Sequence, residues 1–181
     1  MDRFVNWISV NDTQLFHFVN SKLRCRAFDY ILPKITHIGG ATFTILTLLI
    51  VMIFSEKVVQ TWAIEALISL SLSHIIVHII KKMYCRERPY NKLANVTLCS
   101  NPLTDYSFPS GHTTAAFSIA IVFSLHMPML SIFFLPIAIL VGISRMYLGL
   151  HYPTDCIIGA VLGTVSSIIV VFCSFVFFTG Q

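Results

Sequence analysis

The chain has 181 residues, of which 56% are hydrophobic and 11% are charged, and its mean hydropathy is +0.80. A soluble domain carries about 25% charged residues, so this composition excludes a disordered chain, a nucleic-acid-binding domain and most soluble enzymes. Despite a net charge of +4, the abundance of apolar residues predicts one all-α, multi-pass integral membrane domain.

The first predicted element is a segment over residues 1–27, in which apolar and polar residues alternate loosely. This pattern, with Trp7 near its start, is typical of short amphipathic helices that lie in the membrane interface. A simple leader to the first span fits the same residues equally well. Residues 28–181 are then expected to form the transmembrane domain.

Five apolar stretches follow, and each has a length suited to a membrane span. The predicted spans cover residues 30–54, 58–80, 110–126, 129–148 and 155–178. Gly39-Gly40 predicts a close helix contact near one end of the first span, and Pro136 predicts a kink in the fourth. Because the number of spans is odd, the N-terminal segment and the polar stretches 81–109 and 149–154 share one side of the membrane.

Two polar clusters on that side precede the third predicted span. Lys81 and Arg88 lie seven residues apart, which places them on one side of a helix that continues past the second span. Ser110, Gly111 and His112 stand at the start of the next helix. Serine is a favoured N-cap, glycine lets the backbone approach a ligand, and a helix N-terminus binds anions.

A third cluster contains Arg145, His151 and Asp155. Arg145 joins Lys81 and Arg88 as a permanent cation, and arginine geometry matches the oxygen atoms of phosphate. Such a positive site would repel a metal ion, so we expect no metal and no cofactor. The expected ligand is a tetrahedral oxyanion.

Two histidines beside a bound phosphate can divide the chemistry between them. One of His112 and His151 can attack phosphorus, while the other donates a proton to the leaving alcohol. Asp155 can accept a hydrogen bond from His151, which would fix the tautomer of the ring and stabilise its cation.

The order and spacing of these clusters resemble the three-part signature of the type 2 phosphatidic acid phosphatase family of membrane lipid phosphatases. The matching residues are Lys81-x6-Arg88-Pro89, Pro109-Ser110-Gly111-His112 and Ser144-Arg145-x5-His151-x3-Asp155. The resemblance covers about residues 28–178. It implies a helical bundle and metal-independent hydrolysis of a lipid phosphate monoester or diphosphate, of the undecaprenyl diphosphate, phosphatidylglycerophosphate or phosphatidate type.

The resemblance also implies a role for each residue of the signature. His151 would form a phosphohistidine, Asp155 would orient it, and His112 would be the general acid. The implied phosphate-binding residues are Lys81, Arg88, Ser110, Gly111 and Arg145. Family members commonly have six spans, whereas this sequence predicts five and an interfacial segment.

Two other functions remain open from the sequence. The same residues resemble the vanadate site of haloperoxidases, although those relatives are soluble. Glu65, His74 and His78 would instead suit a small membrane transporter with an intramembrane relay. For Glu65 we favour pairing with a neighbouring helix, and for the two histidines we favour buried hydrogen bonds.

The expected partners are a lipid phosphate or diphosphate substrate and membrane lipids, with no nucleic acid, and the expected location is a bacterial plasma membrane. Every Lys and Arg except Lys57 falls on the side of the three clusters, which favours a cytoplasmic site. Bacterial members of the resembling family usually face outward, so both orientations stay open. Cys85 and Cys99 flank one polar stretch and could form a disulfide if that stretch were extracytoplasmic.

Overall fold

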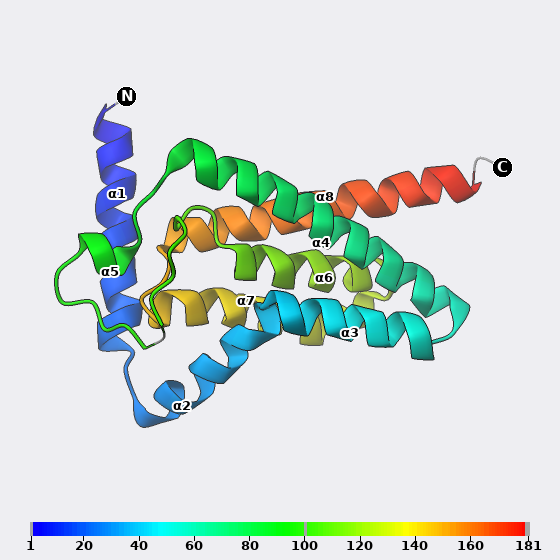
Figure 1. Ribbon diagram of the computed structural model, residues 1–181, viewed down its shortest axis with the longest axis horizontal. Coiled ribbons are helices and arrows are strands. Elements are labelled where there is room, and N and C mark those ends of the chain that lie inside the picture. The colour runs from blue at the N-terminus through cyan, green and yellow to red at the C-terminus, as the bar shows by residue number, and fades with distance from the viewer. Residues whose placement is uncertain (1, 100, 180–181) are drawn as a thin grey trace.

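The structure is a computed structural model that describes residues 2–99 and 101–179, and the described residues form helices with no strand. Figure 1 shows a bundle of nearly parallel helices, with one helix lying across its end. The helices are α1 (Asp2–His17), α2 (Arg26–Ile35), α3 (Ala41–Phe54), α4 (Lys57–Tyr84), α5 (Pro89–Lys92), α6 (Gly111–His126), α7 (Ser131–Tyr147) and α8 (Pro153–Thr179). Three short non-α helical turns lie between these helices: η1 (Phe18–Lys22), η2 (Thr36–Gly39) and η3 (Pro128–Leu130).

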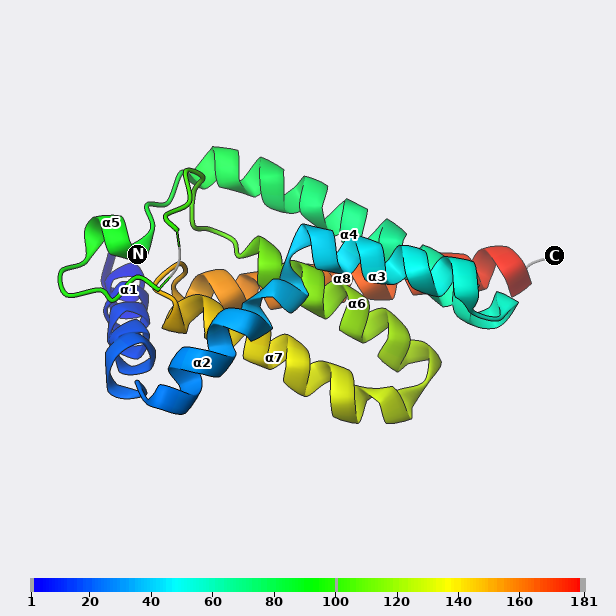
Figure 2. The same ribbon diagram turned by 60° about the horizontal axis from the view of Figure 1, so that its bottom comes forward.

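Helix α6 occupies the centre of the bundle and packs against α4, α7 and α8 (Figures 1 and 2). Its inner positions carry small residues such as Ala115, Ala120 and Ser118, which are buried. On α8, a Cβ at Gly163 would lie 2.5 Å from the Thr114 carbonyl oxygen, so only glycine permits this helix contact. Small residues at such contacts are the usual means by which helices approach closely in a membrane.

Serine side chains connect the three helices at the middle of the bundle. Ser69 on α4 lies 2.9 Å from Ser167 on α8, hydroxyl to hydroxyl, and Ser73 lies 3.0 Å from Ser118 on α6. Ser167 also donates to the Ser118 carbonyl oxygen at 2.8 Å. These bonds satisfy polar groups that hydrocarbon could not, and they fix the relative positions of α4, α6 and α8.

The all-helical membrane architecture predicted from composition is confirmed. In the described part of the chain, three segments are long and apolar enough to cross a membrane, namely 57–92, 128–147 and 153–177, and α2 with α3 makes a fourth if that bent pair is one span. The remaining predicted span, 110–126, corresponds to α6, which has 16 residues.

The first predicted span, residues 30–54, is not one continuous helix. The segment divides into α2, the turn η2 and α3, with a bend of 59° between the two parts. Gly40 has an extended backbone (φ −76°, ψ 147°), which ends the helical hydrogen bonding at the Gly39-Gly40 pair. The predicted close contact at this pair is confirmed, because a Cβ at Gly39 would lie 2.6 Å from the His112 carbonyl oxygen.

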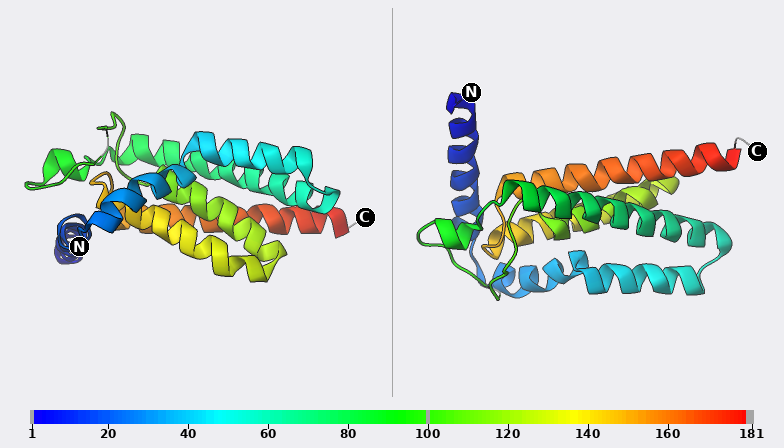
Figure 3. Two further views of the ribbon diagram at one scale, coloured as in Figure 1. Left: turned by 90° about the horizontal axis from the view of Figure 1, so that it is seen from below. Right: turned by 45° about the horizontal axis from the view of Figure 1, so that its top comes forward.

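Helix α1 lies across the polar end of the bundle (Figures 1 and 3). Of its own side chains, Phe16 is fully buried, whereas Trp7 is 62% exposed. Both the interfacial interpretation of residues 1–27 and the simple leader stay predictions. The division into an interfacial segment and a domain over 28–181 stays a prediction, and its last residues, 180–181, lie outside the described residues.

Asp12 fastens α1 to the start of α8. Its carboxylate accepts hydrogen bonds from the Thr154 amide at 2.8 Å, the Thr154 hydroxyl at 2.6 Å and the Arg86 guanidinium at 2.6 Å. We expect Asp12→Ala to lower the free energy of unfolding by about 2 kcal/mol, because buried donors lose their acceptor. Thermal unfolding in detergent measures this loss. The neighbouring change Asn11→Ala removes only a bond to Trp7 of the same helix and serves as the control; equal stability of the two variants would contradict the assignment.

Candidate active site

A cavity of about 500 Å³ opens at the polar end of the bundle, where segments distant in sequence meet. Six of the predicted site residues line it: Lys81, Arg88, Gly111, His112, Arg145 and His151. The other two predicted residues, Asp155 and Ser110, are not among the described residues that line the cavity, and both are fully buried. The three sequence clusters therefore meet at one place.

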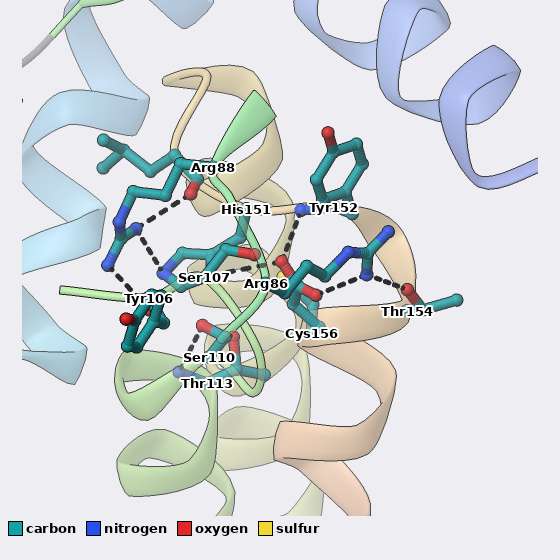
Figure 4. A network of polar contacts seen from close by, with 12 residues as sticks. Arg86, Arg88, Tyr106, Ser107, Ser110, Thr113, His151, Tyr152, Thr154 and Cys156 are labelled. Atoms are coloured by element: carbon teal, nitrogen blue, oxygen red, sulfur yellow. Dashed lines mark hydrogen bonds and ion pairs between the residues drawn. The ribbon is translucent and has the colours of Figure 1, made fainter. Parts of the chain in front are cut away.

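Arg88 is 2% exposed and is held by loops on both sides (Figure 4). Its Nη1 donates to the Leu150 carbonyl oxygen at 2.9 Å, and its Nε donates to the Asp105 carbonyl oxygen at 2.8 Å. Nη1 also lies 3.2 Å from Nε2 of His151. A guanidinium only donates, so this contact requires Nε2 to be the unprotonated, nucleophilic nitrogen of the ring.

His151 is 2% exposed and stands just before α8, with Asp155 one turn later on the helix. The His151 Nδ1 atom lies 3.5 Å from Oδ2 of Asp155, which is longer than an ordinary hydrogen bond. The direct hydrogen bond expected from sequence is therefore not formed at this distance. The carboxylate is instead held by the Tyr152 amide at 2.9 Å and by Arg86 at 2.6 Å.

Arg145 projects from the last turn of α7 and is 3% exposed. Its Nη1 donates to the Thr36 hydroxyl at 2.8 Å, while its Nε has no hydrogen-bond partner among the described residues. A buried cation with an unpaired N–H is unfavourable unless an anion completes its surroundings. Arg145 therefore marks the place where an anionic ligand would bind.

The N-terminus of α6 forms another wall of the cavity. Ser110 is its N-cap, as predicted: its hydroxyl oxygen accepts from the Thr113 amide at 3.5 Å and lies 3.0 Å from the Thr113 hydroxyl (Figure 4). This capping role turns the Ser110 side chain toward the helix. The first N–H groups of a helix have no intrahelical acceptor, which leaves the backbone at Gly111 and His112 suited to an anion.

Sequence reasoning missed Asp105, which lies in the loop before α6. Its carboxylate pairs with Lys81 and, at 2.6 Å, with Arg88. Burial would raise the pKa of Asp105, but the hydrogen bond and charge of Lys81, followed by those of Arg88, lower it to about 2. Asp105 therefore pairs with the two cations in the way that a bound anion would. Because these residues are distant in sequence, only the fold could show this pairing.

Arg86 is a second residue that the sequence did not single out. It joins Asp12 and Asp155 and lies over the Tyr152 ring, with its guanidinium carbon 3.9 Å from the ring centre. The sequence shows Arg86 two residues before Arg88 but gives no sign that the two face different partners. Arg86 supports the carboxylate beside His151, whereas Arg88 faces the cavity.

Burial lowers the pKa of His151 well below its ordinary value of 6.5, and the nearby cations Arg145, Arg88 and Lys81 lower it further. We expect the His151 ring to be neutral at pH 7 in the free protein. Below pH 6.5 the unfolded chain binds a proton at His151 that the folded chain does not. The free energy of unfolding therefore decreases as pH falls below 6.5. An NMR titration of the histidine rings measures the pKa of His151, whose signal is assigned by its absence in His151→Gln. A midpoint at or above 6.5 would contradict the lowered pKa.

The opposite end of the bundle contains a separate cavity of about 660 Å³. Glu65 of α4 pairs there with His126 of α6, whose ring stacks on Trp62 at a centroid distance of 5.1 Å. The expected pairing of Glu65 with a neighbouring helix is thus confirmed. His74 and His78 line the first cavity rather than this one, so the three residues of the proposed relay do not share a site.

Cys85 and Cys99 are both free, and Cys99 accepts a hydrogen bond from Arg24. The disulfide considered from sequence is not formed. Among the described residues, no group of three or more His, Cys, Asp and Glu side chains is arranged to hold a metal ion.

Comparisons with known proteins agree on one family. A family model described as the PAP2 superfamily matches residues 62–178. The bacitracin transport permease protein BcrC of Bacillus licheniformis is 36% identical over 107 residues, which cover 59% of this chain and 53% of that protein. An undecaprenyl-diphosphatase of Sulfolobus acidocaldarius is 33% identical over 102 residues, covering 56% and 50%. The chain thus spans about half the length of these curated relatives.

A solved structure extends the likeness to most of the fold. The crystal structure of a transmembrane PAP2-type phosphatidylglycerolphosphate phosphatase from Bacillus subtilis superposes with a TM-score of 0.78 at 26% identity. The match covers 93% of this chain and 87% of that one.

Proposed function

The chain belongs to the PAP2 superfamily, and from this premise we propose that it is a membrane phosphatase that hydrolyses a lipid phosphate monoester or diphosphate without a metal ion. The observation that carries the proposal is the meeting of two histidines with three cations in one cavity. Relatives named as an undecaprenyl-diphosphatase and a phosphatidylglycerolphosphate phosphatase support a lipid substrate. Two of the reported relatives come from Bacillus, which favours a bacterial plasma membrane.

The first chemical step is the transfer of the phosphoryl group to His151. Arg88, Arg145 and the N-terminus of α6 bind the phosphate oxygens and stabilise the charge of the transition state. The lone pair of His151 Nε2 attacks phosphorus, and the bond from phosphorus to the leaving oxygen breaks. His112 gives its proton to that oxygen, so that the lipid leaves as an alcohol or a lipid monophosphate.

The second step returns the enzyme to its starting state. His112, now unprotonated, takes a proton from a water molecule, which attacks the phosphorus of the phosphohistidine. The bond between nitrogen and phosphorus breaks, and inorganic phosphate leaves. Throughout both steps Asp155, itself held by Arg86 and the Tyr152 amide, stabilises the positive charge that develops on His151.

Phosphate release from a panel of lipids tests the proposal. The purified protein, in detergent with a chelator present, is expected to release phosphate from prenyl or glycerolipid phosphates. Orthovanadate is expected to inhibit this release, since it imitates the tetrahedral phosphate. A halide oxidation that requires vanadate would instead favour the haloperoxidase alternative, and loss of all phosphate release in Glu65→Gln would favour the relay.

A further inference from the structure

His74 and His78 lie on the same face of α4 as Lys81, two turns and one turn before it respectively, and all three side chains line the candidate active site. Of the phosphate-binding residues that the family resemblance implies, Lys81 alone lies on this part of α4. His74 is half-buried, whereas His78 is exposed at the edge of the cavity. The two imidazoles therefore form a polar stripe that leads away from the phosphate-binding cations.

The orientation of His74 follows from one hydrogen bond. Its Nδ1 lies 3.0 Å from the Leu70 carbonyl oxygen, and because a carbonyl only accepts, Nδ1 carries the proton. The other nitrogen, Nε2, faces the start of α6, since a Cβ at Gly111 would lie 3.9 Å from it. The expectation of a buried hydrogen bond thus holds for one nitrogen of His74, while the other faces the ligand cavity.

The cavity is too large for one phosphate group. Its volume of about 500 Å³ compares with about 30 Å³ for a water molecule in the liquid. In the proposed mechanism, the phosphate group that reacts with His151 is bound by Arg88, Arg145 and the N-terminus of α6. A second anionic group of the substrate would meet the remaining partners His74 and His78, with Lys81, which pairs with Asp105, beside them.

Resting on the function proposed above, we propose that His74 and His78 bind the inner phosphate of a lipid diphosphate, so that the site prefers diphosphates to monophosphates. In-line attack by His151 on the terminal phosphorus places the leaving group on the far side of that atom. In a diphosphate this leaving group is a phosphate, whose oxygen atoms and acidic proton can form hydrogen bonds with imidazole nitrogens. With Nδ1 donating to the Leu70 carbonyl oxygen, Nε2 of His74 can accept a hydrogen bond from an acidic phosphate oxygen.

Paired substrates with one chain test this assignment. Farnesyl diphosphate and farnesyl monophosphate share their tail and differ only in the inner phosphate. We expect His74→Gln to lower kcat/KM for the diphosphate by roughly 10- to 100-fold, the loss of one hydrogen bond to a charged group, with less than about threefold change for the monophosphate. His78→Gln, at the exposed edge, is expected to act in the same direction without affecting folding.

Each outcome of this experiment has a separate meaning. An equal loss on both substrates, or no loss on either, would overturn the role of the two histidines. Release of phosphate from neither substrate by the unmodified protein would count against the proposed function itself. Ile75→Ala changes a residue of α4 that is 59% exposed and serves as the control, with thermal unfolding of every variant measured alongside.

Discussion

Replacing His151 by alanine is expected to lower the rate of phosphate release by on the order of 10⁴- to 10⁶-fold, as loss of a nucleophile does in other covalent mechanisms. The expectation follows from the position of Nε2, 3.2 Å from a guanidinium that can hold the phosphate beside it. The variant keeps Arg88, Arg145 and the α6 terminus, so it should still bind substrate. Initial rates and substrate binding, measured separately, distinguish these two effects.

The matched control is His17→Ala, which removes a histidine of α1 outside the cavity and should leave turnover unchanged. A second measurement concerns the intermediate. Brief reaction with a ³²P-labelled substrate should leave an acid-labile label on the unmodified protein and on His17→Ala, but none on His151→Ala. Turnover by His151→Ala within tenfold of the unmodified protein would exclude His151 as the nucleophile.

Replacing His112 by glutamine is expected to slow the hydrolysis of an alkyl phosphate by about 10²- to 10⁴-fold, the usual contribution of a general acid or base. The loss should depend on the leaving group. An alkoxide needs a proton as it departs, whereas nitrophenolate does not. We therefore expect a much smaller effect on the first step with p-nitrophenyl phosphate than with a lipid phosphate.

The second step provides an independent test of His112. Without a base to activate water, the phosphohistidine should accumulate, so that p-nitrophenyl phosphate gives a burst of nitrophenolate followed by slow turnover. Equal losses on both substrates, with no burst, would indicate that His112 only binds phosphate. His126→Gln, at the opposite end of the bundle, controls for the change of side chain.

The residues around the cavity were largely predictable, because their signals are local. Cations near helix ends, and a serine followed by glycine and histidine at a helix start, can be recognised within short stretches of sequence. Six of the eight predicted residues line the cavity, and Ser110 caps α6 as expected. The roles assigned to them stay proposals until the variants are measured.

The supporting residues could not be predicted, because their partners lie far away in sequence. Asp105 meets Lys81, and Arg86 joins Asp12 to Asp155, only after the loops have folded over the bundle. Hydropathy also did not predict the bend at Gly40, because an apolar stretch has the same hydropathy whether its helix is straight or bent. The histidines of α4 were interpreted as structural because sequence alone cannot tell which nitrogen of a ring faces a cavity.

The short central helix sets the depth of the candidate active site. Gly111, at the start of α6, lies beside the His74 ring of α4, and the preceding Ser110 lies beside Gly159 of α8. Helix α4 continues to Tyr84 and α8 begins at Pro153, so at 1.5 Å per residue the flanking helices extend about 15 Å and 9 Å beyond this level. Under the proposed function, a phosphate ester would have to pass below the ends of these flanking helices to reach the cavity. Turnover should consequently follow the mole fraction of substrate in the bilayer plane, as in surface-dilution kinetics, rather than its concentration in bulk water.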